Sequence, residues 1–299
     1  MRPHTAFRPR GMYVASVTPF RDDESLDLDR LATHLEYLVA AGVDGIVVLG
    51  GSGEYVSLSA TERESVIGCA VHIVAKRLPL VVGALGPSTR EALDVAAQAR
   101  RAGADAMLVL PPYYIRPSAA GVVEHFARVA EASGLPVIVY NNPPRAGWAI
   151  DMELLECLAG VPGVVGIKDC DRDVALIAGK IARLGDRISI LSGDDDLGFA
   201  TLLSGAPGAI WATANLAPHL CRDLFDRCSA GDLEGARPLA ERLRQLVHVR
   251  RIPNHPGPLK EMMAMVGRSV GPARRPLVQM NEAERAKVRE VIESLQPVA

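Results

Sequence analysis

The sequence predicts an α/β protein: a closed (β/α)8 barrel, or TIM barrel, with a helical extension at its C-terminal end. Short apolar runs recur along the chain up to about residue 214, and an amphipathic helical stretch follows most of them. Most of the runs are continuously apolar rather than alternating, as expected for parallel strands that are covered on both faces. Eight such units favour a closed barrel.

The apolar runs are spaced as βα units require. They lie at 12–17, 45–50, 78–84, 105–110, 135–140, 163–168, 188–193 and 208–213. The segments AAGVDGIVVLG and RAGADAMLVLPP share a helix–Gly–Asp–strand pattern, which is typical of one supersecondary unit used repeatedly. An open doubly wound sheet is the alternative fold. It usually brings a GxGxxG turn after its first strand, and no such turn stands there.

Beyond residue 214 the sequence predicts helices and no further clear strand. The expected helices lie at 217–229, 231–250, 257–267 and 282–295. We therefore divide the chain into a barrel domain, residues 1–214, and a C-terminal helical extension, residues 215–299.

In such barrels the chemistry lies at the C-terminal ends of the strands, so the residues there are the candidates. Lys168 ends the sixth run, and it is one of only five lysines. A neutral amine can attack a carbonyl, whereas a guanidinium cannot. Apolar walls disfavour the charged ammonium, so we expect a lowered pKa for Lys168. The alternative is a structural ion pair of Lys168 with Asp169 or Asp194.

Tyrosine and arginine side chains follow the fourth and fifth runs. Tyr140 ends the fifth run, one βα unit before Lys168, and we expect its phenol to point into the barrel mouth and to move protons. Arg145 follows in the next loop, where it either binds a carboxylate or is an ordinary surface arginine. Tyr113 and Tyr114 end the fourth run, and aromatic packing at the rim is their simpler interpretation.

The second run ends in the glycine-rich segment GGSGEY. Gly51 and the neighbouring glycines allow a sharp turn that presents backbone N–H groups, and Ser52 adds a hydroxyl. Such a loop can hold a carboxylate, although a plain βα turn has the same composition. A lysine, a phenol, a carboxylate cradle and an arginine together indicate a Schiff-base aldolase or synthase acting on 2-keto acids. A metal-dependent aldolase needs ligands at strand ends, and none of the seven histidines lies at one.

Seven motifs, in order and without large gaps, carry a family resemblance. They are ASVTPF, GGSGEYVSLSATER, PPYYIRPS, YNNPPRAG, GIKD, LSGDDD and GAIWATAN. With them the chain resembles the dihydrodipicolinate synthase / N-acetylneuraminate lyase family of class I pyruvate aldolases. The resemblance implies a 2-keto acid substrate such as pyruvate, no metal or organic cofactor, and a homotetramer built as a dimer of dimers.

By position, the resemblance implies roles for three residues that form the imine or transfer protons. Lys168 corresponds to the lysine that forms the Schiff base with pyruvate, and Tyr140 to the tyrosine that transfers protons. Tyr114 resembles the tyrosine that completes a proton relay, which tetrameric members donate across a subunit interface.

The resemblance also implies substrate-binding residues. Ser52 corresponds to a hydroxyl that binds the pyruvate carboxylate, and Arg145 to an arginine that binds aspartate semialdehyde in the synthase branch. Gly193 and Ile210 correspond to positions that line the pocket near the lysine.

Gly51 departs from the synthase pattern. Synthases usually read Gly-Thr-Thr-Gly-Glu in this loop, and the first threonine links the two tyrosines; Gly51 stands in its place. The Arg145 context favours a synthase that joins pyruvate to aspartate semialdehyde. Gly51 favours the alternatives, an N-acetylneuraminate-lyase-type or sugar-acid aldolase, or a dehydratase of the same family. A non-catalytic keto-acid-binding barrel, of another functional class, would be expected to lack the lysine or the tyrosine.

The composition limits the partners and the compartment. The chain has 299 residues, a formal net charge of -2 and 48% hydrophobic residues, which is ordinary for a globular protein and gives no support for nucleic-acid binding. Its five cysteines are scattered without a CxxC pair, which fits reduced thiols. The basic N-terminus lacks the apolar core of a secretory signal, and no segment approaches the roughly 18 apolar residues of a membrane span. We therefore expect a cytoplasmic protein without a membrane partner.

Overall fold

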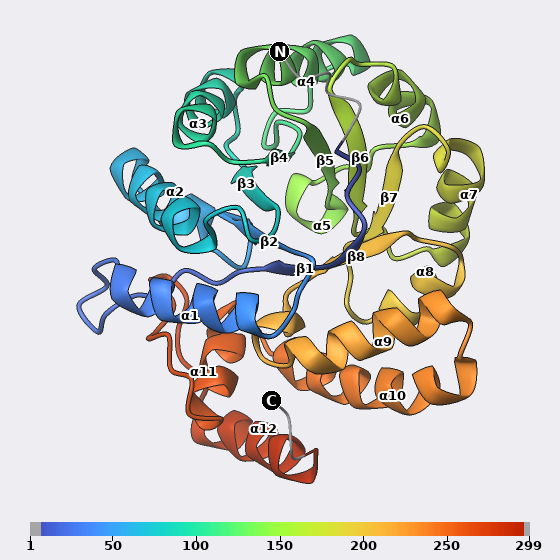
Figure 1. The fold of residues 1–299 in the computed structure, drawn as a ribbon. Coiled ribbons are helices and arrows are strands. Elements are labelled where there is room, and N and C mark those ends of the chain that lie inside the picture. The colour runs from blue at the N-terminus through green and yellow to red at the C-terminus, as the bar shows by residue number, and fades with distance from the viewer. Residues whose placement is uncertain (1–6, 296–299) are drawn as a thin grey trace.

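Eight parallel strands close into a barrel in the computed structural model, which describes residues 7–295. Each strand pairs with the next, and β1 pairs with β8 to close the ring. The strands are β1 (Gly11–Ala15), β2 (Gly45–Val48), β3 (Leu80–Ala84), β4 (Ala106–Val109), β5 (Val137–Asn141), β6 (Val164–Asp169), β7 (Ser189–Ser192) and β8 (Gly208–Trp211). Each overlaps one of the predicted runs, so the predicted TIM barrel is confirmed (Figure 1).

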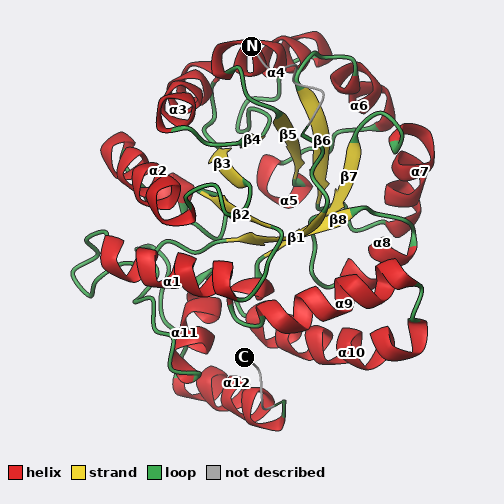
Figure 2. Ribbon diagram, viewed as in Figure 1, coloured by secondary structure: helices red, strands yellow, loops and turns green. Residues whose placement is uncertain are grey.

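Helices surround the barrel on its outer side, as Figure 2 shows. They are α1 (Leu28–Ala40), α2 (Ala60–Val74), α3 (Thr89–Ala102), α4 (Ala119–Ser133), α6 (Met152–Ala159), α7 (Val174–Leu184), α8 (Gly198–Leu203) and α9 (Pro218–Ala230). A short helix, α5 (Pro143–Ala146), and two 3-10 turns, η2 (Tyr55–Ser57) and η3 (Thr213–Asn215), lie in the loops. The strands are therefore enclosed on both faces, which explains why every residue of β2 and β4 is buried, whichever face its side chain points to.

Local signals set where the helices begin. Ser59 accepts a hydrogen bond from the backbone N–H of Glu62, whose carboxylate accepts one in return from the Ser59 N–H. Ser88, Ser118 and Asp151 cap α3, α4 and α6 by accepting from the backbone three residues later. These caps satisfy backbone donors that the first helical turn leaves free.

The C-terminal residues form the four predicted helices. After α9 come α10 (Leu233–Arg250), α11 (Gly257–Met265) and α12 (Glu282–Ser294). Helix α9 follows β8 and packs against β1 and α8, where it takes the eighth place in the outer ring, and α10 packs on α9. The division of the chain at residue 214 stays a prediction.

Buried charges fix α11 to the loop after β2. The Lys260 Nζ lies 2.5 Å from Glu54 Oε1, and both side chains are buried. Lys260 also donates to the Pro272 carbonyl, and the second Glu54 oxygen accepts from the backbone N–H of Arg274. Burial lowers the pKa of Lys260 to about 8, although Glu54 opposes that shift. Because both charges are buried, removing either one would leave the other unpaired and would destabilise this contact.

No helix within residues 7–295 is long and apolar enough to cross a lipid bilayer. The basic N-terminal segment, in which the sequence predicts no secretory signal, begins with residues 1–6, which lie outside the described residues.

Candidate active site

Lys168 and Tyr140 meet at the C-terminal end of the barrel. They lie on the adjacent strands β6 and β5, directly opposite each other in the register. The Lys168 Nζ is 4.6 Å from the centre of the Tyr140 ring, and each residue is only 6% exposed. Parallel strands in register point opposed side chains to the same face, so the barrel brings together two residues that the sequence places one βα unit apart.

The alternative of an ion pair for Lys168 is wrong. The Asp169 carboxylate bonds instead to Lys180 Nζ and Asn141 Nδ2, each at 2.7 Å, because successive side chains of a strand point to opposite faces. Asp194 pairs with Arg172 and Arg251 at the rim. Within the described part of the chain, no carboxylate lies within salt-bridge distance of Lys168.

The pKa of Lys168 is raised, contrary to the expectation of a lowered value. Burial lowers it, but Tyr140, Cys170 and Asp195 together outweigh burial. Tyr140 and Cys170 act in this way only as anions. Burial raises the pKa of Tyr140, and it raises the pKa of Cys170 to about 12. At neutral pH both are uncharged, which leaves Asp195 as the charge that favours the ammonium form.

The Tyr140 hydroxyl has an amide partner and an open space beside it. Asn142 Nδ2 donates to Tyr140 Oη at 2.7 Å. A Cβ on Gly51 would lie 4.0 Å from Tyr140 Oη and would meet no other heavy atom within that distance. The missing threonine side chain of the loop would therefore have faced this phenol. Asn142 is not among the residues predicted from the sequence, and its position two residues after Tyr140 is the signal that could have found it.

The loop after β2 contains a buried serine, Ser52, and its backbone is closely packed. Ser52 is 4% exposed, and its Oγ lies 3.1 Å from His255 Nε2. The backbone N–H groups of Gly51 and Ser52 donate no hydrogen bond to any of residues 7–295. A Cβ on Gly53 would lie 3.1–3.2 Å from three backbone atoms, so this position suits glycine. The loop thus presents the hydroxyl and free backbone donors that the sequence predicts for a carboxylate cradle.

Arg145 lies at the rim, and Tyr114 does not join the site within one chain. Arg145 is exposed on α5 and has no ion-pair partner among residues 7–295; its charge lowers the pKa of His255 and opposes the rise in that of Tyr140. Tyr114 is 97% exposed and has a positive φ of 70°. The structure therefore brings Lys168, Tyr140, Ser52 and Arg145 to one end of the barrel and leaves Tyr114 on the surface.

Gly193 and Ile210 lie at the ends of β7 and β8. The Gly193 N–H donates to the Asp169 carbonyl at 2.8 Å, and a Cβ on Gly193 would lie 2.6 Å from Cys170 Sγ. Only glycine fits so close to strand β6. Ile210 is fully buried and pairs in register with Tyr13 of β1. The pocket-lining role of both residues stays a prediction.

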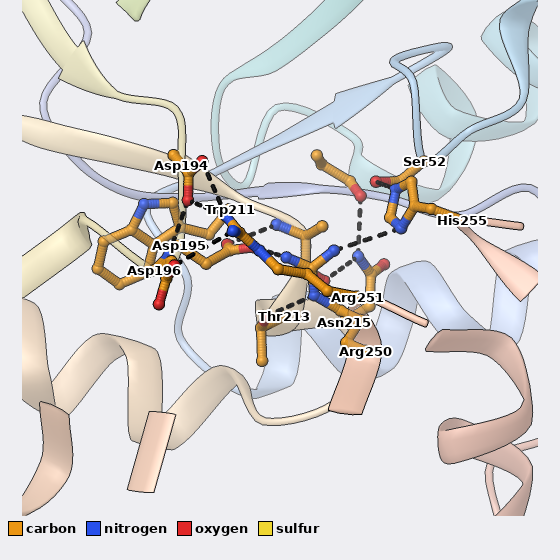
Figure 3. Close-up of polar contacts among 12 residues, drawn as sticks. Ser52, Asp194, Asp195, Asp196, Trp211, Thr213, Asn215, Arg250, Arg251 and His255 are labelled. Carbon is orange, nitrogen blue, oxygen red and sulfur yellow. Dashed lines mark hydrogen bonds and ion pairs between the residues drawn. The ribbon is translucent and has the colours of Figure 1, made fainter. Parts of the chain in front are cut away.

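Two residues near the strand ends come from the C-terminal segment, and neither was predicted from the sequence. Arg250, the last residue of α10, pairs with the buried Asp195, and His255 follows in the connection to α11 (Figure 3). Neither residue follows a barrel strand. The available signal was Asp195 in the motif SGDDD, because a carboxylate at a buried strand end needs a cationic partner.

Within residues 7–295, no group of three or more His, Cys, Asp or Glu side chains could hold a metal ion.

Known proteins resemble the chain over nearly its whole length. The family model described as the dihydrodipicolinate synthetase family matches residues 8–295. A 4-hydroxy-tetrahydrodipicolinate synthase of Methanothrix thermoacetophila is 36% identical over 95% of this chain and 96% of its own. The crystal structure of dihydrodipicolinate synthase from Aquifex aeolicus has a TM-score of 0.93 and 34% identity, covering 97% of this chain and 99% of that one. A dihydrodipicolinate synthase from Acinetobacter baumannii, complexed with pyruvate, has a TM-score of 0.92 and 33% identity, covering 96% and 98%.

Proposed function

The chain belongs to the dihydrodipicolinate synthetase family, as its motifs predicted, and we propose that it is a class I, Schiff-base-forming lyase that acts on pyruvate or a related 2-keto acid. One observation carries the proposal. The Lys168 amine is buried at the C-terminal end of the barrel, 4.6 Å from the Tyr140 ring, with no carboxylate in salt-bridge distance among the described residues. A lysine placed for structure alone would be paired, as Lys180 and Lys260 are.

The reaction begins at Lys168. Lys168 first gives up its ammonium proton to water, and its neutral amine then attacks the C2 carbonyl of the keto acid. The carbonyl oxygen leaves as water, and an iminium remains. The positive iminium nitrogen withdraws electrons, so C3 loses a proton and an enamine forms. The enamine carbon then attacks the aldehyde carbon of the acceptor and forms the new C–C bond, and the aldehyde oxygen takes up a proton. Hydrolysis of the second iminium releases the product and restores Lys168.

Tyr140 suits the proton transfers of these steps. Burial raises the pKa of its phenol, so at neutral pH it carries the proton that the departing oxygen needs. After that transfer, the phenolate keeps the hydrogen bond from Asn142 Nδ2 and faces the positive nitrogen on Lys168. The same group can then take the proton from C3.

The substrate carboxylates have separate partners. Ser52 and the free N–H groups of its loop bind the carboxylate of the keto acid. Arg145, with no ion-pair partner among the described residues, binds a second carboxylate on the acceptor. These two sites support aspartate semialdehyde as the acceptor and a 4-hydroxy-tetrahydrodipicolinate synthase activity.

Gly51 supports a second candidate within the same mechanism. The open space between Gly51 and Tyr140 Oη admits a bulkier acceptor than a threonine would. An N-acetylneuraminate-lyase-type or sugar-acid aldolase, or a sugar-acid dehydratase, would use this space.

The chain acts as a homotetramer in the cytoplasm under this proposal. Tyr114 is 97% exposed and the next residue, Ile115, is 74% exposed, which suits a contact with another subunit that brings Tyr114 to the partner's site. All five cysteines are free thiols, which fits a reducing compartment.

A substrate panel tests the proposed function. The protein is incubated with pyruvate and aspartate semialdehyde, and separately with sialic acid and several deoxy-keto sugar acids, while product and released pyruvate are measured. We expect turnover that requires pyruvate with aspartate semialdehyde. Background activity with pyruvate and aspartate semialdehyde, together with turnover of a sugar acid, would favour the second candidate function, a sugar-acid aldolase or dehydratase. Background activity with every substrate and no pyruvate imine would refute the Schiff-base proposal.

A further inference from the structure

A continuous chain of side chains links the C-terminal segment to the loop after β2. Ser52 Oγ lies 3.1 Å from His255 Nε2, and His255 Nδ1 lies 3.3 Å from Arg250 Nη1. The Arg250 guanidinium pairs with Asp195 and also donates from Nε to Thr213 Oγ1 at 3.0 Å. Figure 3 shows this series running from the aspartates after β7, through Arg250 and His255, to Ser52.

The partners of His255 determine which of its nitrogens carries the proton. A guanidinium can only donate, so His255 Nδ1 must accept from Arg250. The neutral ring then carries its proton on Nε2, which donates to Ser52 Oγ. Ser52 accepts this bond, and its hydroxyl donates no hydrogen bond to any of the described residues. Its proton is therefore free to point to the strand ends.

We propose that His255 is a positioning residue that orients the Ser52 hydroxyl so that it donates to the carboxylate of the 2-keto acid. The inference rests on the proposed function, because it concerns the carboxylate site of that reaction. With Nε2–H directed at its oxygen, Ser52 is restricted to the donor role that an anionic ligand requires. Without that bond the hydroxyl can rotate, and part of the binding energy is lost in ordering it.

Three features show that His255 is held in this state. Arg250, its partner, is 8% exposed and is fixed by the buried Asp195 and Thr213. The charged groups that act on the imidazole are Arg250, Arg145 and Lys168, and all three are cationic. Burial first, and then these charges, lower the pKa of His255 well below its usual value, so the ring is neutral at physiological pH.

Three substitutions of His255 distinguish a role as hydrogen-bond donor to Ser52 from a role in packing alone. His255→Gln places an amide N–H near the position of Nε2, whereas His255→Asn reaches only the position of Nδ1. His255→Ala removes both. The pyruvate concentration that half-saturates borohydride trapping is measured for each, beside the melting temperature and the maximal trapping rate. We expect a roughly 3- to 10-fold increase for Ala and Asn, the range of one hydrogen bond, and less than about twofold for Gln.

A double-mutant cycle with Ser52 completes the test. In Ser52→Ala, adding His255→Ala should change pyruvate half-saturation by less than about 1.5-fold, because the group that His255 orients is already gone. His248→Ala, on the exposed side of α10, is the matched control and should behave as wild type.

The outcomes are distinct. Equal losses in Asn, Gln and Ala, or additive losses in the double variant, would overturn the positioning role of His255. Failure of wild-type protein to form any pyruvate imine would instead overturn the proposed function.

Discussion

The site joins two pairs of residues that the fold positions in different ways. Tyr140 and Lys168 lie on adjacent strands and are held by the backbone ladder of the barrel. Ser52 and His255 are 203 residues apart, and side chains hold them together between a loop and an irregular connection. The strand pair has little freedom to move, as bond-forming chemistry requires. The loop pair can change without disturbing the barrel, so we expect it to set how tightly the keto acid binds.

The two pairs also differ in how they carry charge. The pKa of Lys168 is raised despite its burial, whereas burial and three cations lower the pKa of His255. The positive charge at neutral pH therefore lies on the lysine and the arginines, and the histidine remains a neutral hydrogen-bond donor. A site with this distribution attracts an anionic substrate before any covalent step occurs.

The largest effect is expected from the strand pair. Lys168→Ala should reduce turnover to background and abolish trapping with pyruvate and borohydride, because Lys180 and Lys260, the other buried lysines among residues 7–295, are held in ion pairs. Lys168→Arg should do no better, since a guanidinium stays protonated. Both activities are measured beside Lys287→Ala, an exposed lysine on α12, which should retain wild-type values. Substantial turnover by Lys168→Ala would contradict covalent catalysis.

Tyr140→Phe should have the next largest effect. Loss of the phenol removes a proton-transfer group, a loss worth about 10²- to 10⁴-fold in kcat. Trapping should slow while the pyruvate concentration for half-saturation changes little, because the carboxylate site stays intact. A kcat within about fivefold of wild type would show that another group moves the protons.

Arg145→Ala should affect the acceptor more than the keto acid. A charge-assisted hydrogen bond to a carboxylate is worth about 1.5–3 kcal/mol, or roughly 10- to 150-fold in kcat/KM. Pyruvate trapping should remain nearly unchanged. Arg128→Ala, an exposed arginine on α4, is the control. Equal losses in trapping and in acceptor turnover would place Arg145 at the keto-acid site instead.

Gly51→Thr should give the smallest change and separates the two candidate functions. The added side chain fits, because a Cβ there meets only Tyr140 Oη, at 4.0 Å. If the protein is a synthase, activity with aspartate semialdehyde should be preserved or should rise up to a few-fold. If Gly51 instead makes room for a bulkier acceptor, the variant should lose activity with that acceptor. Background activity with aspartate semialdehyde in both proteins would exclude the synthase activity.

The part of the site that lies on strands, Tyr140 and Lys168, could be predicted from the sequence. In a barrel of parallel strands, the order of the strands along the chain is also their order in space. Apolar runs ending in Tyr140 and Lys168 are enough to place these side chains together once the parallel register is assumed. The ion-pair alternative for Lys168 failed because strand alternation turns Asp169 toward Lys180, a partner on a helix.

The part of the site that lies outside the strands could not be predicted in this way. His255 and Arg250 follow no strand, and their positions depend on how the C-terminal helices pack around α9 and the loop after β2. The direction of the Lys168 pKa shift was missed for a similar reason. It depends on Asp195, whose distance from Lys168 is set by folding and not by spacing along the chain.

The central claim is that Lys168 captures the keto acid, and peptide mapping of a trapped adduct tests it most directly. The protein is treated with pyruvate and borohydride, digested and analysed by mass spectrometry. We predict one reduced adduct, formed only when pyruvate is present, on the peptide that contains Lys168. An adduct mapped to Lys180 or Lys260, or no adduct at saturating pyruvate, would contradict the account.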